Sequence, residues 1–136
     1  MDARRNDSAA KNILIAEHDQ ESGEKLMAAL KTYNFTGDLV HDGQTVLEKL
    51  NTGVYDAILL NLVLPTITGI DVLTTIRKPE SKHKKLAVFV MTNFDHRHLI
   101  EAAFTIGADR FFLKSQLSSD AMIAEIANFF AQLPKT

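Results

Sequence analysis

The chain of 136 residues contains no cysteine. It can therefore form no disulfide bond, no cysteine-ligated zinc or iron–sulfur site, and no thiol nucleophile. Long apolar runs are also missing, because runs such as residues 57–60 and 86–91 fall far short of the roughly 20 residues that cross a bilayer. These absences exclude a membrane-spanning helix, and they exclude redox chemistry that does not use a borrowed cofactor.

The chain also lacks a strong excess of either charge. Seventeen acidic side chains stand against fifteen basic ones, which leaves a formal net charge of −2. A general nucleic-acid binder carries a marked positive excess, so no nucleic acid is expected as a partner, and no membrane either. Residues 1–11 contain no apolar segment of the kind that a secretory signal needs. We therefore expect a cytoplasmic protein in which residues 1–11 are a flexible leader and residues 12–136 form one domain.

Short apolar runs alternate five times with amphipathic stretches. Hydrophobic residues make up 46% of the chain, which is enough for one sizeable core. The runs predict strands at residues 13–16, 36–41, 55–60, 86–91 and 110–113. Apolar residues three and four positions apart predict the five helices, which are marked by Leu26, Ala29, Leu30 and Tyr33; by Val46, Leu47 and Leu50; by Ile70, Leu73 and Ile76; by Leu99, Ile100, Ala103 and Phe104; and by Met122, Ile126, Phe129 and Leu133.

Strands that are joined by helices run parallel, with right-handed crossovers. The pattern therefore predicts an α/β fold, with a single doubly wound sheet of five parallel strands and helices on both faces. Sites in such sheets lie beyond the carboxyl ends of the central strands. The polar residues that follow the strands should therefore converge, and these are Glu17, His18, Asp19, Asn61, Thr92, Asn93, Lys114 and Ser115.

Four motifs lie at these strand ends. An apolar run leads into Glu17-His18-Asp19, and Tyr55-Asp56 is followed by four apolar residues, Asn61, Leu-x-x-Pro and a glycine. Thr92 ends a further apolar run, and residues 107–114 read Gly-Ala-Asp-Arg-Phe-Phe-Leu-Lys. Together they resemble the response-regulator receiver domain (CheY-like), which accepts a phosphoryl group from a histidine kinase. The resemblance covers essentially everything after the leader and implies the flavodoxin-like strand order 2-1-3-4-5.

The largest departure from the family is Asn61, which stands where the resemblance implies the phosphoacceptor aspartate. An aspartyl phosphate forms when a carboxylate oxygen attacks phosphorus while Mg²⁺ and a lysine neutralise the transferring oxygens. The Asn61 amide is uncharged and its lone pair is delocalised, so attack from this position should be lost. The sequence therefore predicts a pseudo-receiver, which is not phosphorylated at the usual position.

The magnesium site that the resemblance implies is depleted as well. The family places carboxylates at the positions of Glu17, His18 and Asn61, and a backbone carbonyl at the position of Val63. Only Glu17 keeps a carboxylate, and the charge of Lys114 cancels it. We therefore expect no cofactor and no dedicated metal site, with Mg²⁺ bound weakly at most.

Three features of this pocket each have two interpretations. Glu17 and Lys114 are either a remnant of the catalytic pair or a structural ion pair across the strand ends. His18 either ligates a softer metal such as zinc or nickel, or fills the vacated site as a hydrogen-bonded loop residue. Asp19 either shifts by one position to restore a carboxylate, or caps the following helix. The structural interpretation is favoured in each case.

Other positions of the family pattern also differ. Phe111 stands at the switch aromatic position and lacks the tyrosine hydroxyl, whereas Thr92 matches the switch hydroxyl. Ser115 replaces the proline that usually follows the lysine, so the Lys114–Ser115 peptide bond should be trans. His96 reads as part of a solvated helix start.

Two features outside the pocket are candidate interfaces. A basic loop that contains Lys78, Lys82, His83, Lys84 and Lys85 lies on the far side of the sheet from the pocket, where it is either merely solvated or docks an acidic partner. Phe129 and Phe130 are adjacent, so one of them should point away from the core stripe and could contact a partner.

The leading hypothesis is a stand-alone signalling module of the two-component or phosphorelay type, which is not an enzyme and acts through protein–protein contacts. Its contact surface is expected on the helix at 99–104, the strand at 110–113 and the last helix, with another protein or a second copy as partner. The alternative is a phosphoryl-accepting response regulator whose Asn61 is introduced or compensated. A flavodoxin-like enzyme is a third class, but it cradles a cofactor phosphate with hydroxyl- and glycine-rich sequence where this chain has Glu17-His18-Asp19.

Overall fold

The computed structural model describes residues 10–93 and 96–134 and contains a five-stranded parallel sheet. Its strands are β1 (Asn12–Ala16), β2 (Thr36–Val40), β3 (Ala57–Asn61), β4 (Ala87–Thr92) and β5 (Arg110–Leu113). The helices are α2 (Gln20–Thr32), α3 (Gly43–Thr52), α4 (Gly69–Arg77), α5 (Arg97–Ile106) and α6 (Ser119–Ala131). The strand order is β2-β1-β3-β4-β5, which confirms the predicted doubly wound α/β fold.

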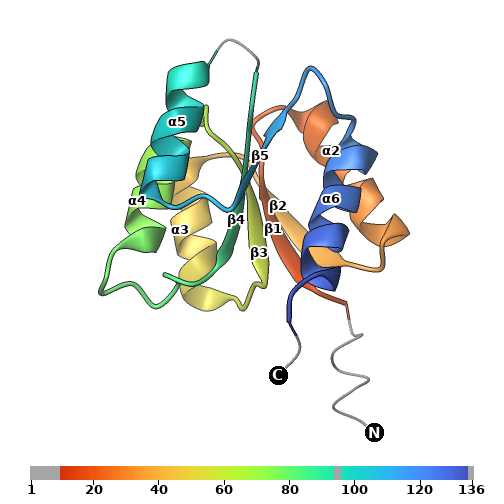
Figure 1. The fold of residues 1–136 in the computed structure, drawn as a ribbon, viewed down its shortest axis with the longest axis horizontal. Helices are drawn as coiled ribbons and strands as arrows, with labels where there is room; N and C mark the ends of the chain where they lie inside the picture. The colour runs from red at the N-terminus through yellow and green to blue at the C-terminus, as the bar shows by residue number, and fades with distance from the viewer. Residues whose placement is uncertain (1–9, 94–95, 135–136) are drawn as a thin grey trace, which may run out of the picture.

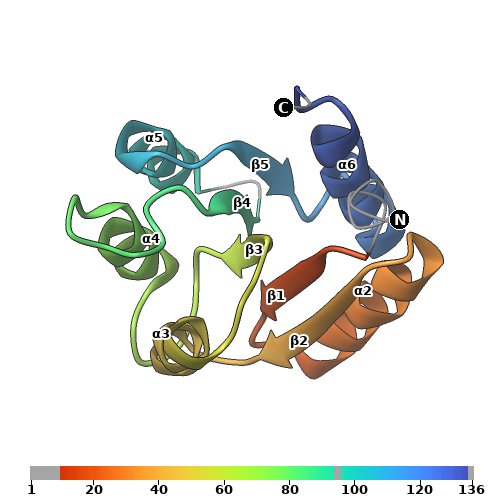
Figure 2. The ribbon, with the colours of Figure 1, turned by 90° about the horizontal axis from the view of Figure 1, so that it is seen from below.

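The helices form two layers, one on each face of the sheet. Helices α3, α4 and α5 cover one face, and α2 and α6 cover the other (Figures 1 and 2). Side chains alternate along each strand, so Leu14 of β1 joins the core under α3–α5 while its neighbours Ile13 and Ile15 join the core under α2 and α6. All three side chains are fully buried, as expected of a central parallel strand covered on both faces.

Polar side chains define where four of the helices begin. Asp19, Asp42, Thr68 and Ser118 each precede a helix, and each accepts a hydrogen bond from a backbone N–H three residues further on. A glycine marks the C-terminal end of the remaining helix, α5: Gly107 adopts a φ of 132°, a conformation that side-chain-bearing residues rarely adopt. The helix starts are therefore fixed locally by the sequence.

The predicted third strand, at residues 55–60, is displaced along the chain. The third strand begins at Ala57 rather than at Tyr55, and it extends to Asn61. Tyr55 is used elsewhere, since its hydroxyl donates a 2.6 Å hydrogen bond to Asp38 Oδ2.

Predictions about four apolar residues need correction. Phe104 does not join the core stripe of α5 but is 44% exposed, and Leu133 lies beyond α6 and is 46% exposed. Neither Phe129 nor Phe130 points freely into solvent, because Phe129 packs against Phe89 with ring centroids 5.0 Å apart and Phe130 packs against Phe35. The predicted leader falls almost wholly outside the described residues. None of the helices within the described ranges is long and apolar enough to cross a membrane.

The parallel hydrogen-bond pattern continues past the carboxyl ends of the strands. The backbone N–H of Glu17 donates to the Val40 carbonyl, and that of Lys114 donates to the Thr92 carbonyl, at 3.0 and 2.9 Å. The residues that follow β1 and β5 are thereby held in register with the sheet. Gly69, at the start of α4, approaches the same edge, and its N–H donates to the Leu62 carbonyl at 3.1 Å.

Replacing Gly69 by alanine should destabilise the fold. The added Cβ would lie 2.5 Å from the Asn61 carbonyl oxygen and from the Leu62 Cα, and backbone atoms can move only if the loop moves. We expect a loss of at least about 2 kcal/mol in the free energy of unfolding, measured by urea denaturation. Gly23→Ala in α2 is the matched control, since its Cβ would meet only the flexible end of Leu39. That variant should change stability by less than about 1 kcal/mol, and equal losses in the two variants would contradict this account.

Candidate functional site

Three polar side chains meet at the carboxyl edge of the sheet. Glu17 follows β1, Asn61 is the last residue of β3, and Lys114 follows β5. Glu17 is 1% exposed and Asn61 is 8% exposed, so both are buried at the edge. Of the residues predicted to converge, Asn61 and Lys114 each contact Glu17 directly.

The Glu17 carboxylate accepts hydrogen bonds from three residues. Lys114 Nζ donates to Oε1 at 2.5 Å, and the backbone N–H of Asp19 donates to Oε2 at 3.0 Å. Asn61 Nδ2 lies 3.1 Å from Oε2 and 3.3 Å from Oε1. One ammonium and several N–H dipoles thus balance the only carboxylate in this cluster, as a buried charge requires.

The Asn61 amide is used at both ends. While Nδ2 donates to Glu17, Oδ1 accepts a 3.0 Å hydrogen bond from the backbone N–H of Val63. These partners fix which end of the amide faces the carboxylate. An aspartate in the same place would set a second negative charge about 3 Å from Glu17, which opposes the ionisation of both groups.

The residues at this edge do not fit the magnesium site of a receiver. Within the described ranges, no three histidine, aspartate or glutamate side chains are placed to hold a metal ion together. Glu17 is the only carboxylate of the cluster, and it is already paired with Lys114. Mg²⁺ prefers several hard oxygen ligands, and this site offers too few of them.

The structure confirms the predicted role of Asp19 but not that of His18. Asp19 caps α2 as the structural interpretation predicts, and the backbone hydrogen bond from Ser22 holds the pKa of its carboxyl below the usual value. The prediction that His18 fills the vacated site was wrong, because His18 is exposed. The space beside Glu17 is instead occupied by the Asn61 amide and the Lys114 ammonium.

Two histidines at this edge have contacts that the sequence did not reveal. Thr92 Oγ1 and His96 Nδ1 are 2.8 Å apart, so the prediction of a merely solvated His96 was wrong. His41 Nδ1 lies 3.0 Å from the Glu17 carbonyl oxygen, to which the ring donates. The spacing of four between Thr92 and His96 was the only signal available, and it is not specific. Asn93 and Ser115, also predicted to converge, are exposed, and the Lys114–Ser115 bond is trans.

Phe111 lies on the outer side of β5 and not in the polar cluster. It is 39% exposed, and its ring packs edge to face on Phe104 of α5, with centroids 5.6 Å apart. Two aromatic rings thus form an exposed apolar patch on the α5–β5 surface.

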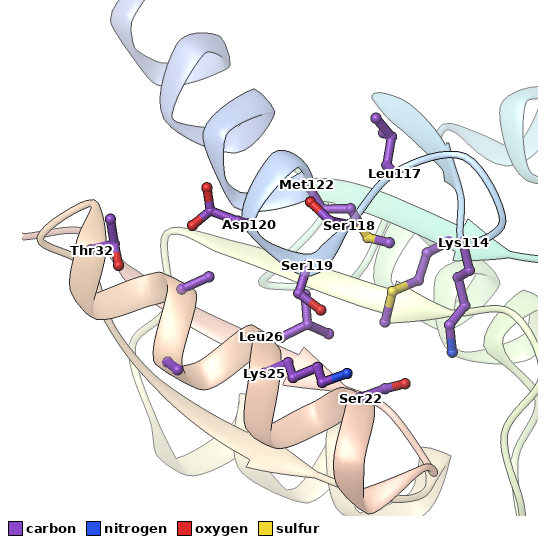
Figure 3. Close-up of a pocket in the computed structure, with 13 residues that line it drawn as sticks. Ser22, Lys25, Leu26, Thr32, Lys114, Leu117, Ser118, Ser119, Asp120 and Met122 are labelled. Atoms are coloured by element: carbon purple, nitrogen blue, oxygen red, sulfur yellow. The ribbon is translucent and has the colours of Figure 1, made fainter.

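A cleft of about 530 Å³ opens beside Lys114, between α2 and α6. Ser22, Lys25 and Lys114 lie towards one end of it, and Thr32 and Asp120 lie towards the other (Figure 3). Leu26 and Met122 contribute apolar surface between them. The carboxyl edge therefore continues into a groove that has basic groups at one end.

The sequence of this chain is similar to those of known proteins. A model of the "Response regulator receiver domain" family matches residues 13–127. "Transcriptional regulatory protein PcoR" of Escherichia coli is 29% identical over 102 residues, which cover 75% of this chain and 44% of that protein. "Response regulator ArlR" of Staphylococcus saprophyticus is 28% identical over 123 residues, covering 90% of this chain and 54% of that protein. The chain thus spans about half the length of these curated relatives.

Solved structures share the fold. A response regulator from Chloroflexus aurantiacus superposes with a TM-score of 0.81 at 20% identity, covering 90% of this chain and 99% of that one. The receiver domain of a sensor histidine kinase from Pseudomonas aeruginosa gives a TM-score of 0.77 at 22% identity, covering 90% and 98%. That structure is described with a magnesium ion coordinated in its active-site cleft.

Removing the Lys114 ammonium should destabilise the protein strongly. Lys114→Met leaves the buried Glu17 carboxylate without its counterion, and we expect a loss of about 3 kcal/mol in the free energy of unfolding, measured by urea denaturation. The double variant Glu17→Gln with Lys114→Met removes both charges and should recover at least half of that loss. Lys25→Met is the control, because the Lys25–Glu21 pair is exposed and should contribute less than about 0.5 kcal/mol. Equal effects of the two single variants would show that Glu17 does not depend on Lys114.

Proposed function

Since the chain belongs to the response regulator receiver domain family, we propose that it is a two-component signalling module that takes no phosphoryl group at position 61 and acts by contact with a protein partner. The observation that carries the proposal is the pair of hydrogen bonds from Asn61 Nδ2 to Glu17. An amide nitrogen faces the carboxylate at the position where the family has its nucleophile. The molecule is then a binding module, neither an enzyme nor a cofactor-dependent protein.

The chemistry of phosphotransfer fails here at two separate points. The Asn61 side chain offers an amide oxygen, already bonded to the Val63 N–H, where a carboxylate oxygen would attack phosphorus. The second point is the neutralisation of the transferring oxygens, which needs a divalent cation and a lysine. Lys114 is engaged by Glu17, and Mg²⁺ has too few anionic ligands to bind more than weakly.

The partner surface that we propose is formed by α5, β5 and α6. Phe104 and Phe111 are the large exposed apolar side chains on this surface, and their rings support each other. Interfaces are enriched in aromatic residues of this kind, surrounded by polar ones. The partner is then a protein, either a different one or a second copy of this chain, in the cytoplasm, and neither a nucleic acid nor a membrane.

Phosphorylation by a small donor tests the first half of the proposal. Incubated with acetyl phosphate and Mg²⁺, the wild-type protein should gain no phosphoryl mass. Asn61→Asp supplies a nucleophile but leaves His18 where a magnesium ligand is needed, so it should react poorly. The double variant Asn61→Asp with His18→Asp should react measurably, and only with Mg²⁺, because the nucleophile and the metal act as a unit. Intact-protein mass spectrometry measures all three.

The control for this series is Asn61→Asp with His98→Asp, which makes the same histidine replacement at an exposed position of α5. It should behave like Asn61→Asp alone. Phosphorylation of the wild-type protein would refute the proposal, and equal phosphorylation of the single and double variants would show that His18 is not the obstacle.

The double variant Phe104→Ser with Phe111→Ser tests the second half. Both side chains are exposed, so the free energy of unfolding should change by less than about 1 kcal/mol. The immobilised wild-type protein should capture a partner from an extract of the source cells. The phenylalanine variant should capture at least tenfold less of that partner. Val54→Ser is the control, since Val54 is 87% exposed on a different part of the surface. Retention of the partner by the phenylalanine variant would exclude this surface.

A further inference from the structure

A second pocket lies between α3 and α4, under the basic loop at residues 78–85. Its volume is about 390 Å³, and it is lined by Leu47, Leu50, Asn51, Thr75, Ile76, Lys78, Glu80, Ser81, Lys82 and His83. We propose that this pocket docks an acidic protein segment that inserts an apolar side chain. The inference does not depend on whether position 61 accepts a phosphoryl group.

The floor of the pocket is apolar. Leu50 and Ile76 belong to the core under α3–α5, where they are 3% and 1% exposed, and Leu47 is a partly buried residue packed against the same core. Leu47 keeps part of its apolar surface accessible, and covering that surface with another apolar group is favourable. The floor therefore suits the side chain of a leucine or phenylalanine on an incoming segment.

His83 lines the pocket and supplies a polar group that lacks a partner. Its Nε2 atom is buried and forms no hydrogen bond within the part of the chain that the structure describes. A buried polar atom without a partner is destabilising, because it has lost its hydrogen bonds to water and gained none in return. A hydrogen-bonding group on the occupant, either a backbone group or a carboxylate, would relieve that cost once a rotation of the His83 ring exposed Nε2 to the pocket. An aliphatic molecule without polar atoms would not.

The rim has the charge that an acidic occupant requires. Lys78 and Lys82 line the pocket together with a single carboxylate, that of Glu80. Lys84 and Lys85 extend the basic surface beyond the pocket on the same loop, and all four lysines are exposed. Because the charge continues past the pocket, the occupant that fits is a chain segment with several acidic residues beside its apolar side chain.

The loop is held in place before any partner arrives. Arg77 Nη1 donates to the Lys84 carbonyl at 3.0 Å, and Lys84 Nζ donates to the Pro79 carbonyl at 3.2 Å. The His83 N–H donates to Ser81 Oγ at 2.9 Å. A preorganised loop loses little conformational entropy on binding.

The test is a nuclear magnetic resonance titration of the full chain with blocked peptides. The first probe is Glu-Glu-Asp-Leu-Leu-Asp-Glu-Glu, the second replaces both leucines by alanine, and the third replaces all acidic residues by lysine. The first should shift the backbone amides of residues 47–51 and 75–83, with a dissociation constant on the order of 100 µM. The second and third should bind at least tenfold more weakly. Raising the salt concentration should weaken the binding of the first probe.

Two charge-reversal variants separate this pocket from general electrostatics. Lys78→Glu with Lys82→Glu should weaken the binding of the first probe at least tenfold. Lys25→Glu with Lys31→Glu, on exposed positions of α2, should leave the affinity for this probe unchanged. His83→Leu should weaken binding more than His83→Gln, which keeps a hydrogen-bonding side chain. The proposal would be overturned if the two charge reversals weakened peptide binding equally, or if the shifts were absent at millimolar peptide or confined to other surfaces. It would also be overturned if the RNA hexamer U6 bound more tightly than the first probe.

Discussion

A buried carboxylate is the constraint on which the carboxyl edge depends. Glu17 is 1% exposed, and an isolated charge at such a position would cost several kcal/mol. The groups that stabilise it come from distant parts of the chain: Asn61, a hydrogen-bond donor, is 44 residues away, and Lys114, the counterion, is 97 residues away. The ion pair and the amide contacts therefore tie the ends of β1, β3 and β5 together, and they can form only when the whole sheet is assembled.

The exchange of one carboxylate for an amide changes the character of this edge. In a receiver with an aspartate at position 61, the acidic groups repel each other, and a cation relieves the repulsion. In this chain the amide donates to Glu17 and accepts from Val63, so both ends of the side chain at position 61 are bonded to protein groups. Lys114 and Thr92 keep the polar residues that end the other strands of the site, while position 61 carries an amide in place of a carboxylate.

Much of this was predictable from the sequence. Alternating apolar runs gave the five strands because parallel strands buried on both faces must be apolar, and the carboxyl-edge rule brought Glu17, Asn61 and Lys114 together. The contact between Thr92 and His96 could not be predicted, since it depends on the path of a loop and not on a repeating pattern. The outward position of Phe104 was missed because an apolar residue at helical spacing looks the same whether it meets the core or an exposed ring such as Phe111.

The self-neutralised cluster at the carboxyl edge also affects how the molecule meets others in solution. A paired ammonium and carboxylate 2.5 Å apart project less electric field than either charge would alone, so this pair contributes little to the steering of diffusing ions. The basic loop at residues 78–85 lies at the opposite end of the sheet, just before β4, and its lysines project a positive field from a chain whose net charge is −2. An acidic protein would therefore be oriented, on first encounter, by the end of the sheet opposite Asn61, and the rate of that encounter would fall as ionic strength rises.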